Sequence, residues 1–526
     1  MITYLRKTIV LLLFLASPPL LLAQYPNIRV SQPGSIKPEE VTISINPTNP
    51  LNLAAGANID YYYYSMDGGL TWVEGHLTST LGVWGDPCVA FDSAGNLYFS
   101  HLSNPADGDW LDRIVVQKSI DGEMSWNDGV GVGLNPPKDQ DKEWLTADLT
   151  DSPFRNNLYM AWTEFDRYGS PDPNDSTRIL FSRSIDFGET WSQPIKVSDV
   201  GGDCLDGDNT VEGAVPAVGP DGEIYLSWAG PLGIVFDKST DGGLTFGKDT
   251  FVTSQPGGWN FEVPGIYRCN GLPVTACDIS NSTFRGNIYI AWSDQRNGTD
   301  NTNVFFIKST NGGESWSEIK RVNDDTTKAQ QFFPWMTVDP VTGIIYFVFY
   351  DRRNTHGNET EVYVAKSENG GESFTNFRVS ESSFTTTPEV FFGDYINIAA
   401  RDGMVYPIWT RMDGFDLSVW MAIIDMTVDV ELVDEPNVID DFELLQNYPN
   451  PFNPVTTISF QLPKTSQVNL SIYNIKGQLV RTLLNEKRTA GHHSVTWKAN
   501  GVGSGIYFYR ITAGNYSAVK KCTILK

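Results

Sequence analysis

Short apolar segments separated by polar turns recur along most of the chain. Segments such as NLYFSH at 96–101, NLYMAW at 157–162 and NIYIAW at 287–292 are almost continuously apolar, and each follows a turn containing Asn or Gly. Short apolar runs bounded by turn residues predict strands that are covered on both faces. The pattern therefore predicts a chain built from many short β-strands.

One eight-residue turn, close to Ser-x-Asp-Gly-Gly-x-Thr-Trp, occurs six times at intervals of 54 to 70 residues. Its Asp can accept hydrogen bonds from backbone N–H groups, its Gly supplies positive φ, and its aromatic residue can pack on the sheet. Two copies carry Asn instead of Asp, so the position requires an acceptor and not a charge. We therefore predict a structural role for the acceptors Asp67, Asp121, Asp186, Asp241, Asn311 and Asn369.

Each turn follows a third strand, so one unit consists of four strands over roughly 60 residues, as in a propeller blade. Counting strands instead of turns gives seven units, because 41–57 supplies a first strand pair and Leu417–Ile424 a last third strand. Asn27–Ser31 resembles the fourth strands of other units and is predicted to close the ring beside Leu417–Ile424. Ring closure removes exposed sheet edges. The pattern predicts an all-β, seven-bladed propeller, with six blades as the alternative.

These turns resemble the Asp-box, or BNR repeat, of sialidase-like β-propellers, and the resemblance covers residues 27–426. Sialidases of this type have six blades, whereas other Asp-box propellers have seven. The family's early Phe/Tyr-Arg-Ile-Pro segment is absent, and the nearest arginine, Arg29, lies on the predicted closing strand. The resemblance therefore implies the fold more strongly than sialidase activity.

Residues 427–443 are acidic and lack periodicity, which is typical of a linker. From 444 to 526, alternating strands separated by Gly, Asn and Pro predict a small Ig-like β-sandwich. Through Asn447–Pro454, Ile475-Lys-Gly and Gly505-Ile-Tyr, it resembles the C-terminal sorting domain of type IX secretion. This resemblance implies a Gram-negative host, the type IX secretion machinery as a partner, and removal of the module after export.

Residues 1–23 resemble a secretory signal peptide, with Arg6 and Lys7 preceding an apolar run too short for a confident membrane span. The predicted organisation is a signal peptide (1–23), a propeller (24–426), a linker (427–443) and a sorting module (444–526). We expect a protein that is secreted or attached to the outer cell surface, without a transmembrane span.

Charge separates the two predicted folded parts. The formal net charge is −25, yet residues 441–526 carry ten Lys and Arg against three Asp and Glu. An acidic body argues against nucleic acid as a partner, because that binding needs clustered cations. It leaves glycans or cations as ligands.

In a propeller, the loops before the first strands and after the second strands meet at the mouth of the central channel, opposite the Asp-boxes. We expect acids and arginines to gather there, and loops that differ between blades suit a site. The candidate ligand-binding residues are Asp86, Asp141, Glu143, Asp294, Arg296, Asp351, Arg352, Arg353, Asp394 and Arg411. The alternative for each residue is an ion pair that joins neighbouring blades.

Three functions remain open: binding of a glycan or another extracellular ligand at the mouth, glycoside hydrolysis, and a structural surface role without a small ligand. Arginines suit carboxylates, and paired carboxyls suit glycosidic chemistry of the sialidase-like or β-glucan-cleaving kind. No catalytic residue can be assigned, so whether the protein is an enzyme stays open.

Two further candidates concern metal and redox chemistry. Asp203, Asp206 and Asp208 form a candidate calcium site, although the segment departs from the EF-hand pattern. No other cofactor is indicated. Cys269 and Cys277 are a candidate disulfide, since export favours oxidation.

Overall fold

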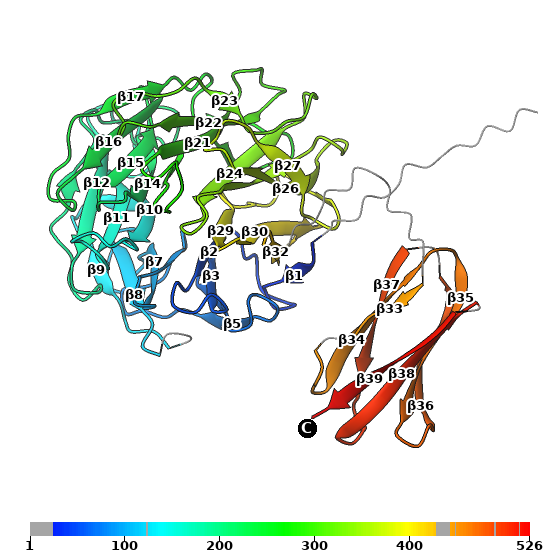
Figure 1. The fold of residues 1–526 in the computed structure, drawn as a ribbon. Helices are drawn as coiled ribbons and strands as arrows, with labels where there is room; N and C mark the ends of the chain where they lie inside the picture. Colours follow the sequence, from blue (N-terminus) through cyan, green and yellow to red (C-terminus); the bar gives the residue numbers. More distant parts are fainter. Residues whose placement is uncertain are drawn as a thin grey trace, which may run out of the picture. The chain divides into compact units, whose positions relative to one another are not determined.

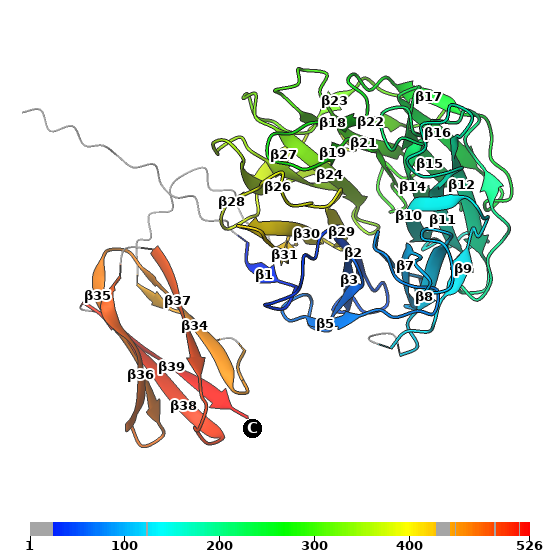
Figure 2. The ribbon, with the colours of Figure 1, turned by 180° about the vertical axis from the view of Figure 1, so that it is seen from behind.

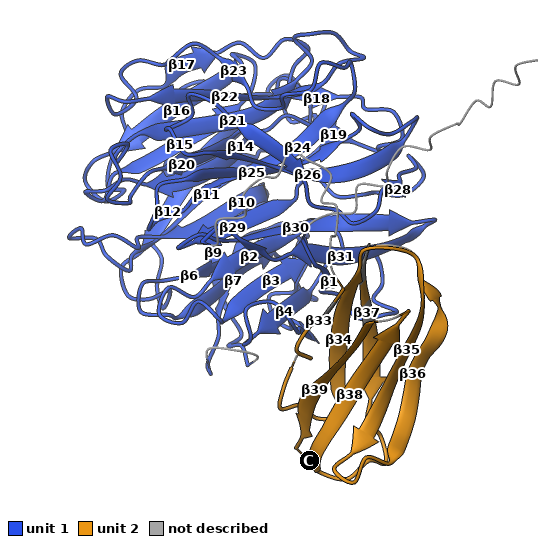
Figure 3. Cartoon of the chain, turned by 45° about the vertical axis from the view of Figure 1, so that its right-hand side comes forward, with its two compact units in different colours: residues 1–428 blue, residues 429–526 orange. Residues whose placement is uncertain are grey.

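The computed structural model describes residues 25–121, 125–427, 442–447, 449–488, 491–514 and 516–525. The predicted signal peptide and nearly all of the predicted linker lie outside these residues. The described residues form strands and turns without helices, and none of their elements is a long apolar helix able to cross a membrane. The all-β class is confirmed. The chain divides into two compact units, Met1–Val428 and Asp429–Lys526 (Figure 3).

The first unit contains seven antiparallel sheets in which four strands pair in one path (Figure 1). In six of them the four strands follow chain order from the centre outward. The strands are β2–β5 (Thr42–Ile45, Leu53–Ala57, Tyr61–Ser65, Val73–His76), β6–β9 (Cys88–Phe91, Leu97–Leu102, Ile114–Lys118, Val130–Val132), β10–β13 (Asp139–Ala147, Leu158–Phe165, Thr177–Ser184, Ile195–Lys196), β14–β17 (Glu212–Val218, Ile224–Ala229, Ile234–Ser239, Thr250–Thr253), β20–β23 (Val274–Cys277, Ile288–Asp294, Asn303–Ser309, Lys320–Arg321) and β24–β27 (Gln331–Val338, Ile345–Asp351, Glu359–Ser367, Thr375–Arg378). The seventh sheet is described below.

The first strands of these sheets form the centre of the unit. Neighbours contact one another in a closed circle (Figure 2), which consists of β2, β6, β10, β14, β20, β24 and β29 (Asn397–Arg401). These strands line a channel of about 280 Å³. Between neighbouring sheets, the second strands bury large aromatic side chains, including Trp162, Trp228 and Trp292. Burial of such rings on both faces explains the continuously apolar segments of the sequence. The propeller fold is therefore confirmed.

The N-terminal segment completes the seventh sheet. β1 (Asn27–Arg29) pairs with β31 (Asp416–Ala422), which follows β30 (Met404–Asp413) and β29. Asn27 lies opposite Ala422, and Val30 N donates to Val419 O at 2.8 Å. The predicted pairing of the two ends of the ring is confirmed, and it leaves the β31 edge covered.

In every Asp-box turn, the Asp or Asn side chain accepts from the backbone N–H four residues further on. In the first copy, Thr71 N donates to Asp67 Oδ1 at 2.9 Å, and Gly69 N donates to Ser65 Oγ at 2.9 Å. In the fifth copy, Ser315 N donates to Asn311 Oδ1 at 3.0 Å. Since the amide oxygen of Asn makes the same bond as the carboxylate, the turn requires an acceptor, as predicted.

Short extra strands depart from the repeat. A two-stranded ribbon, β18 (Asn260–Phe261) and β19 (Cys269–Asn270), is inserted between β17 and β20. β28 (Phe384–Thr385) pairs with β26, and β32 (Ile424–Asp425) pairs with β30. The ribbon matters most, because it supplies side chains to the mouth of the channel.

The second unit has two sheets that share one apolar core containing Ile458, Phe460, Trp497 and Tyr509. This arrangement is the predicted β-sandwich. Its strands are β33 (Glu443–Leu444), β34 (Val455–Leu462) and β37 (Gly491–Lys498) in one sheet, and β36 (Leu479–Arg488), β35 (Ser466–Asn474), β38 (Gly505–Ala513) and β39 (Tyr516–Ile524) in the other.

Candidate functional site

The chain enters three successive inner strands through a charged residue with left-handed backbone. Glu40, Asp86 and Lys142 have φ of 54°, 51° and 55°. At the corresponding positions near the start of β14, β24 and β29, this conformation is adopted by Gly213 at 78°, Phe333 at 49° and Gly393 at 86°. Positive φ costs little for Gly and more for other residues, and such strain concentrates at functional sites. The first three sheets therefore keep charged side chains at positions where Gly would be less strained.

These side chains line a cavity at the mouth of the propeller. It has a volume of about 300 Å³ and is bordered by loops of the first four sheets, by the inserted ribbon and by the segment before β29. Six carboxyl side chains line it, against two cationic ones. The charged lining residues are Glu39, Glu40, Asp86, Asp141, Asp206, Glu212, Lys142 and Arg268.

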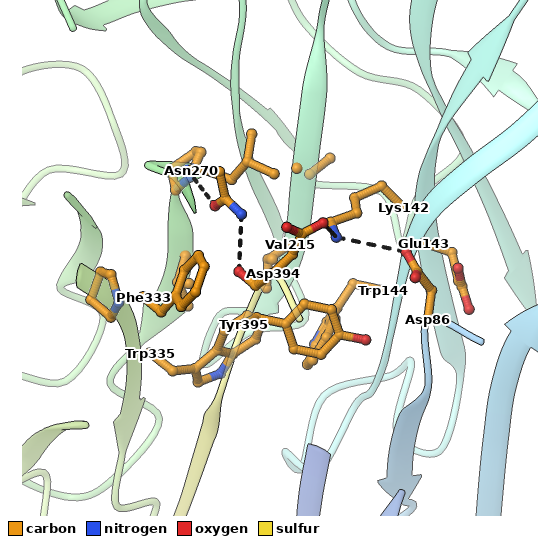
Figure 4. Close-up of a pocket in the computed structure, with 16 residues that line it drawn as sticks. Asp86, Lys142, Glu143, Trp144, Val215, Asn270, Phe333, Trp335, Asp394 and Tyr395 are labelled. Atoms are coloured by element: carbon orange, nitrogen blue, oxygen red, sulfur yellow. Dashed lines mark hydrogen bonds and ion pairs between the residues drawn. The ribbon is translucent and has the colours of Figure 1, made fainter. Parts of the chain in front are cut away.

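Aromatic side chains close the mouth cavity toward the channel. Trp144 and Trp335 have ring centroids 4.3 Å apart, and Tyr395 packs edge-on against Trp144 at 5.7 Å. They line a narrower space of about 40 Å³ together with Asp86, Lys142, Glu143 and Asp394 (Figure 4). The mouth cavity thus has a floor of aromatic side chains, and two of them, Trp144 and Trp335, also line the channel below.

Lys142 lies at the centre of the charged groups. Its Nζ is 3.3 Å from Asp394 Oδ2, 3.7 Å from Asp86 Oδ2 and 4.0 Å from Glu40 Oε1. Burial alone would lower the pKa of Lys142, but these carboxylates hold that pKa well above its usual value. Lys142 therefore stays charged and neutralises part of the cluster.

Arg268 reaches the same cluster from the inserted ribbon. Its Nε donates to Asp394 Oδ1 at 3.0 Å, and its Nη1 donates to Asp206 Oδ2 at 3.0 Å. Asn270 of the same ribbon donates to the backbone oxygen of Asp394 at 2.9 Å (Figure 4). Burial would raise the pKa of Asp394, but Lys142 and Arg268 hold that pKa below its ordinary value, so Asp394 is ionised.

Other carboxyl groups at the site have no such partner. Burial raises the pKa of Asp141 to about 8, with a further contribution from Asp86, and burial raises the pKa of Glu39 to about 8. Burial also raises the pKa of Glu143 and Glu212 well above the usual range. The site therefore combines an ionised carboxylate, Asp394, with carboxyl groups that hold their protons near neutral pH.

Aromatic side chains form the outer wall of the cavity. Trp84 and Trp110 are 41% and 43% exposed, and their rings meet edge to face at 6.4 Å. The Trp110 ring also meets the Tyr168 ring edge to face, with centroids 5.7 Å apart. The Tyr168 hydroxyl donates to Asp206 Oδ2 at 2.6 Å. Exposed tryptophans next to buried carboxyls give the cavity both a flat apolar surface and groups that form hydrogen bonds.

Four of the ten predicted ligand-binding residues, Asp86, Asp141, Glu143 and Asp394, lie at this site. The other six form local contacts elsewhere. Arg296 Nε lies 2.9 Å from Asp294 Oδ1, Arg353 pairs with Asp351 at 2.8 Å, and Arg411 pairs with Asp413 at 3.0 Å. Arg352 is buried and donates to Pro264 O at 2.7 Å, to Thr360 at 3.0 Å and to Thr386 at 3.1 Å. These contacts match the alternative of ion pairs and loop supports.

The three aspartates of the candidate calcium site do not converge. Asp203 accepts from Thr210, Asp206 from Tyr168 and Arg268, and Asp208 from the backbone of Asn260. Within the described ranges, no three His, Cys, Asp or Glu side chains are grouped as metal ligands. The loop between β13 and β14 therefore uses these carboxylates as hydrogen-bond acceptors instead of as a calcium cage.

The candidate disulfide is absent, since Cys269 and Cys277 are both buried free thiols. Cys269 is in the ribbon, whereas Cys277 is at the far end of β20. Proximity in sequence gave the wrong prediction because a strand separates the two residues.

Several residues of the site were not found from the sequence. Lys142 was overlooked between the predicted Asp141 and Glu143, although its place before an inner strand equals that of Asp86. Arg268 belongs to an insertion that has no counterpart in other units. The 70-residue interval between the fourth and fifth Asp-boxes was the signal for that insertion.

Comparison with known proteins identifies the C-terminal module. Residues 446–525 match the secretion system C-terminal sorting domain. The predicted sorting module is confirmed, and with it a protein that is secreted or held at the outer surface of a Gram-negative bacterium. No curated protein matches the chain.

Among solved structures, three matches are similar to the propeller region. A protein of unknown function from Dyadobacter fermentans is 13% identical, with 65% of this chain and 94% of that chain covered and a TM-score of 0.41. The Hadza microbial sialidase Hz136 is 14% identical (73% and 75% covered, TM-score 0.41). The NanB sialidase of Streptococcus pneumoniae is 9% identical (72% and 84% covered, TM-score 0.43). At this level of similarity, the function of these proteins cannot be transferred to this chain.

Proposed function

We propose that the exported propeller binds a glycan in the mouth cavity. The observation that carries the proposal is the presence, in one cavity, of two exposed tryptophans and several buried carboxyl groups. A sugar ring presents C–H groups on its face, which pack on an aromatic ring, and hydroxyls at its edge, which donate to carboxylates. Trp84 and Trp110 would contact the face, and Asp141 and Glu212 would bind the hydroxyls.

The charge of the cavity selects among glycans. Both cationic side chains are already paired with carboxylates, Lys142 with Asp394 and Asp86, and Arg268 with Asp394 and Asp206. Neither cation is free to bind an acidic sugar, whose carboxylate would lie beside Asp86, Asp206 and Asp394, and this is unfavourable in a partly buried site. The cavity favours neutral or basic sugars over sialic acid.

Hydrolysis of the bound glycan is the second candidate. Glycosidases pair a carboxylate with a carboxylic acid that keeps its proton. Here the pKa of Asp394 is lowered and that of Asp141 is raised to about 8, so one site offers both states. Release of reducing ends from a bound oligosaccharide would favour this candidate, and its loss in Asp141→Asn would support the role of the acid.

Replacement of a cavity tryptophan tests glycan binding. Trp110→Ala should weaken binding of a glycan, found by array screening of the secreted protein, by about tenfold or more, since stacking on an exposed ring contributes on the order of 1–2 kcal/mol. Phe187→Ala is the matched control, because Phe187 is also 43% exposed but lies in an Asp-box turn. Titration calorimetry measures both affinities. Equal affinities in both variants, or no glycan bound at all, would contradict the proposal.

A further inference from the structure

The mouth holds more carboxyl groups than its two cations pair with. In the described chain, Lys142 and Arg268 form ion pairs with Glu40, Asp86, Asp206 and Asp394. The remaining carboxyl groups have no ion pair within 4 Å among the residues described; they are Glu39, Asp141, Glu143 and Glu212. A surplus of acids alone does not define a ligand, so the hydrogen bonds of these groups are decisive.

Three of the surplus side chains, Glu39, Glu143 and Glu212, have buried oxygens that receive no hydrogen bond from the described residues, and the last two are the most deeply buried. Glu212 is 4% exposed and lines the mouth cavity, and its Oε2 receives no hydrogen bond from the described residues. Glu143 is 3% exposed and lines the narrower space beside Lys142, and neither of its oxygens receives a bond there (Figure 4). Buried polar atoms are nearly always hydrogen-bonded in folded proteins. These acceptors therefore lack the donors that a ligand in the cavity can supply.

We infer that the ligand carries a protonated primary amine, so that the mouth cavity recognises a basic glycan such as an oligosaccharide of unacetylated hexosamine. This inference rests on the proposed glycan-binding function. An ammonium group is a donor of three hydrogen bonds with no acceptor. In the mouth cavity it supplies a donor for the unpartnered Glu212 Oε2, and its charge offsets the carboxylate that Glu212 becomes on losing its proton.

A metal ion, an anionic ligand and a free lysine side chain fit the mouth cavity less well than an amino sugar does. Among the described residues, no set of carboxyls is grouped closely enough to share one metal ion. An anionic ligand would compete with Asp394 and Asp206 for Arg268. A cavity of about 300 Å³ lies at the lower end of small-ligand pockets, and its exposed tryptophans give a sugar ring a flat surface that a free lysine side chain does not need.

Protonation gives the inference a second consequence. Burial raises the pKa of Glu212, with Asp206 and Asp141 adding to the effect, while Lys142 and Arg268 oppose it. A bound ammonium group stabilises the ionised carboxylate and lowers that pKa again. Binding of the amine at pH 6 should therefore release protons, whereas binding of a neutral sugar should release none.

The test is calorimetric titration of the full secreted protein at pH 6 with three trisaccharides of β-1,4-linked glucosamine, N-acetylglucosamine and glucose. We expect the glucosamine trisaccharide to bind at least tenfold more tightly than the other two. It should also be the one whose binding heat changes with the ionisation enthalpy of the buffer. Equal binding of all three without proton release would overturn the inference and leave the proposed function standing. Binding of none, with no glycan found by array screening, would remove the proposed function as well.

The variant Glu212→Gln tests whether Glu212 is responsible for the tighter binding of the glucosamine trisaccharide. The amide is isosteric and uncharged, so the variant should fold, lose about tenfold in affinity for the glucosamine trisaccharide and keep its affinity for a neutral one. Glu189→Gln, a change at an exposed Asp-box residue, should bind as the unmodified protein does. A uniform loss for every trisaccharide in Glu212→Gln would show that Glu212 shapes the cavity instead of binding the amine. Glu143→Gln provides a second, independent variant with the same expected result.

Discussion

The two ends of the propeller channel differ in how they treat polar groups. At the Asp-box face, Asp67 and its counterparts accept bonds from the N–H groups and hydroxyls of their own turns. At the mouth, Glu143 and Glu212 are buried with unmatched oxygens, and Asp86 and Lys142 have left-handed backbone. One face repeats a single folding solution, whereas the other buries carboxyl groups without partners and differs from sheet to sheet. This difference teaches that regularity marks the scaffold and irregularity marks the site.

Removal of the closing strand should have the largest effect on stability. Deletion of residues 25–33 from the mature protein removes β1 and fully buried Val30, and exposes the edge of β31. We expect a loss on the order of 3–5 kcal/mol or more in the free energy of unfolding, measured by urea denaturation. A deletion variant as stable as the full chain would show that β1 does not hold the ring closed.

Asp-box substitutions should affect stability and not binding. Asp241→Ala removes the acceptor of Thr245 N, Thr245 Oγ1 and Ser239 Oγ, and should cost about 1–3 kcal/mol. Asp241→Asn should cost much less, because Asn311 makes the corresponding bond from Ser315 N in its own turn. Thermal unfolding compares the two variants. If Asp241→Asn is as damaging as Asp241→Ala, the turn requires the charge and its role is not purely structural.

Carboxyl groups at the mouth should make the propeller less stable as pH rises. The folded-state pKa of Glu39 and of Asp141 is about 8, above the ordinary value of each. The folded protein therefore holds more protons than the unfolded chain between about pH 4 and pH 8, and its stability falls across that window. Urea denaturation at pH 5 and pH 8 measures the change. The double variant Glu39→Gln, Asp141→Asn should flatten the dependence, and an unaltered slope would contradict this account.

The regular parts of the molecule could be predicted from the sequence, whereas the mouth could be predicted only in part. The Asp-box acceptors, the pairing of Asn27–Arg29 and the C-terminal sandwich were predicted, because each depends on local periodicity or turn chemistry. The cavity was predicted in part through Asp86, Asp141, Glu143 and Asp394. Arg352 donates to Pro264 O, a contact that nothing local in the sequence shows. Arg268, Trp84 and Trp110 were missed because loops of unequal length bring them together only in three dimensions.

The pair of single substitutions Asp141→Asn and Asp241→Asn tests the central claim most directly. Both replace a carboxyl group with an amide of the same shape, one at the mouth and one in an Asp-box. Calorimetric titration of each variant with the best glycan ligand is the decisive measurement. We expect Asp141→Asn to lower the affinity by about tenfold while the melting temperature stays the same or rises, and Asp241→Asn to leave the affinity unchanged. Unchanged affinity in Asp141→Asn, with a fall in stability, would contradict the assignment of the mouth as the functional face.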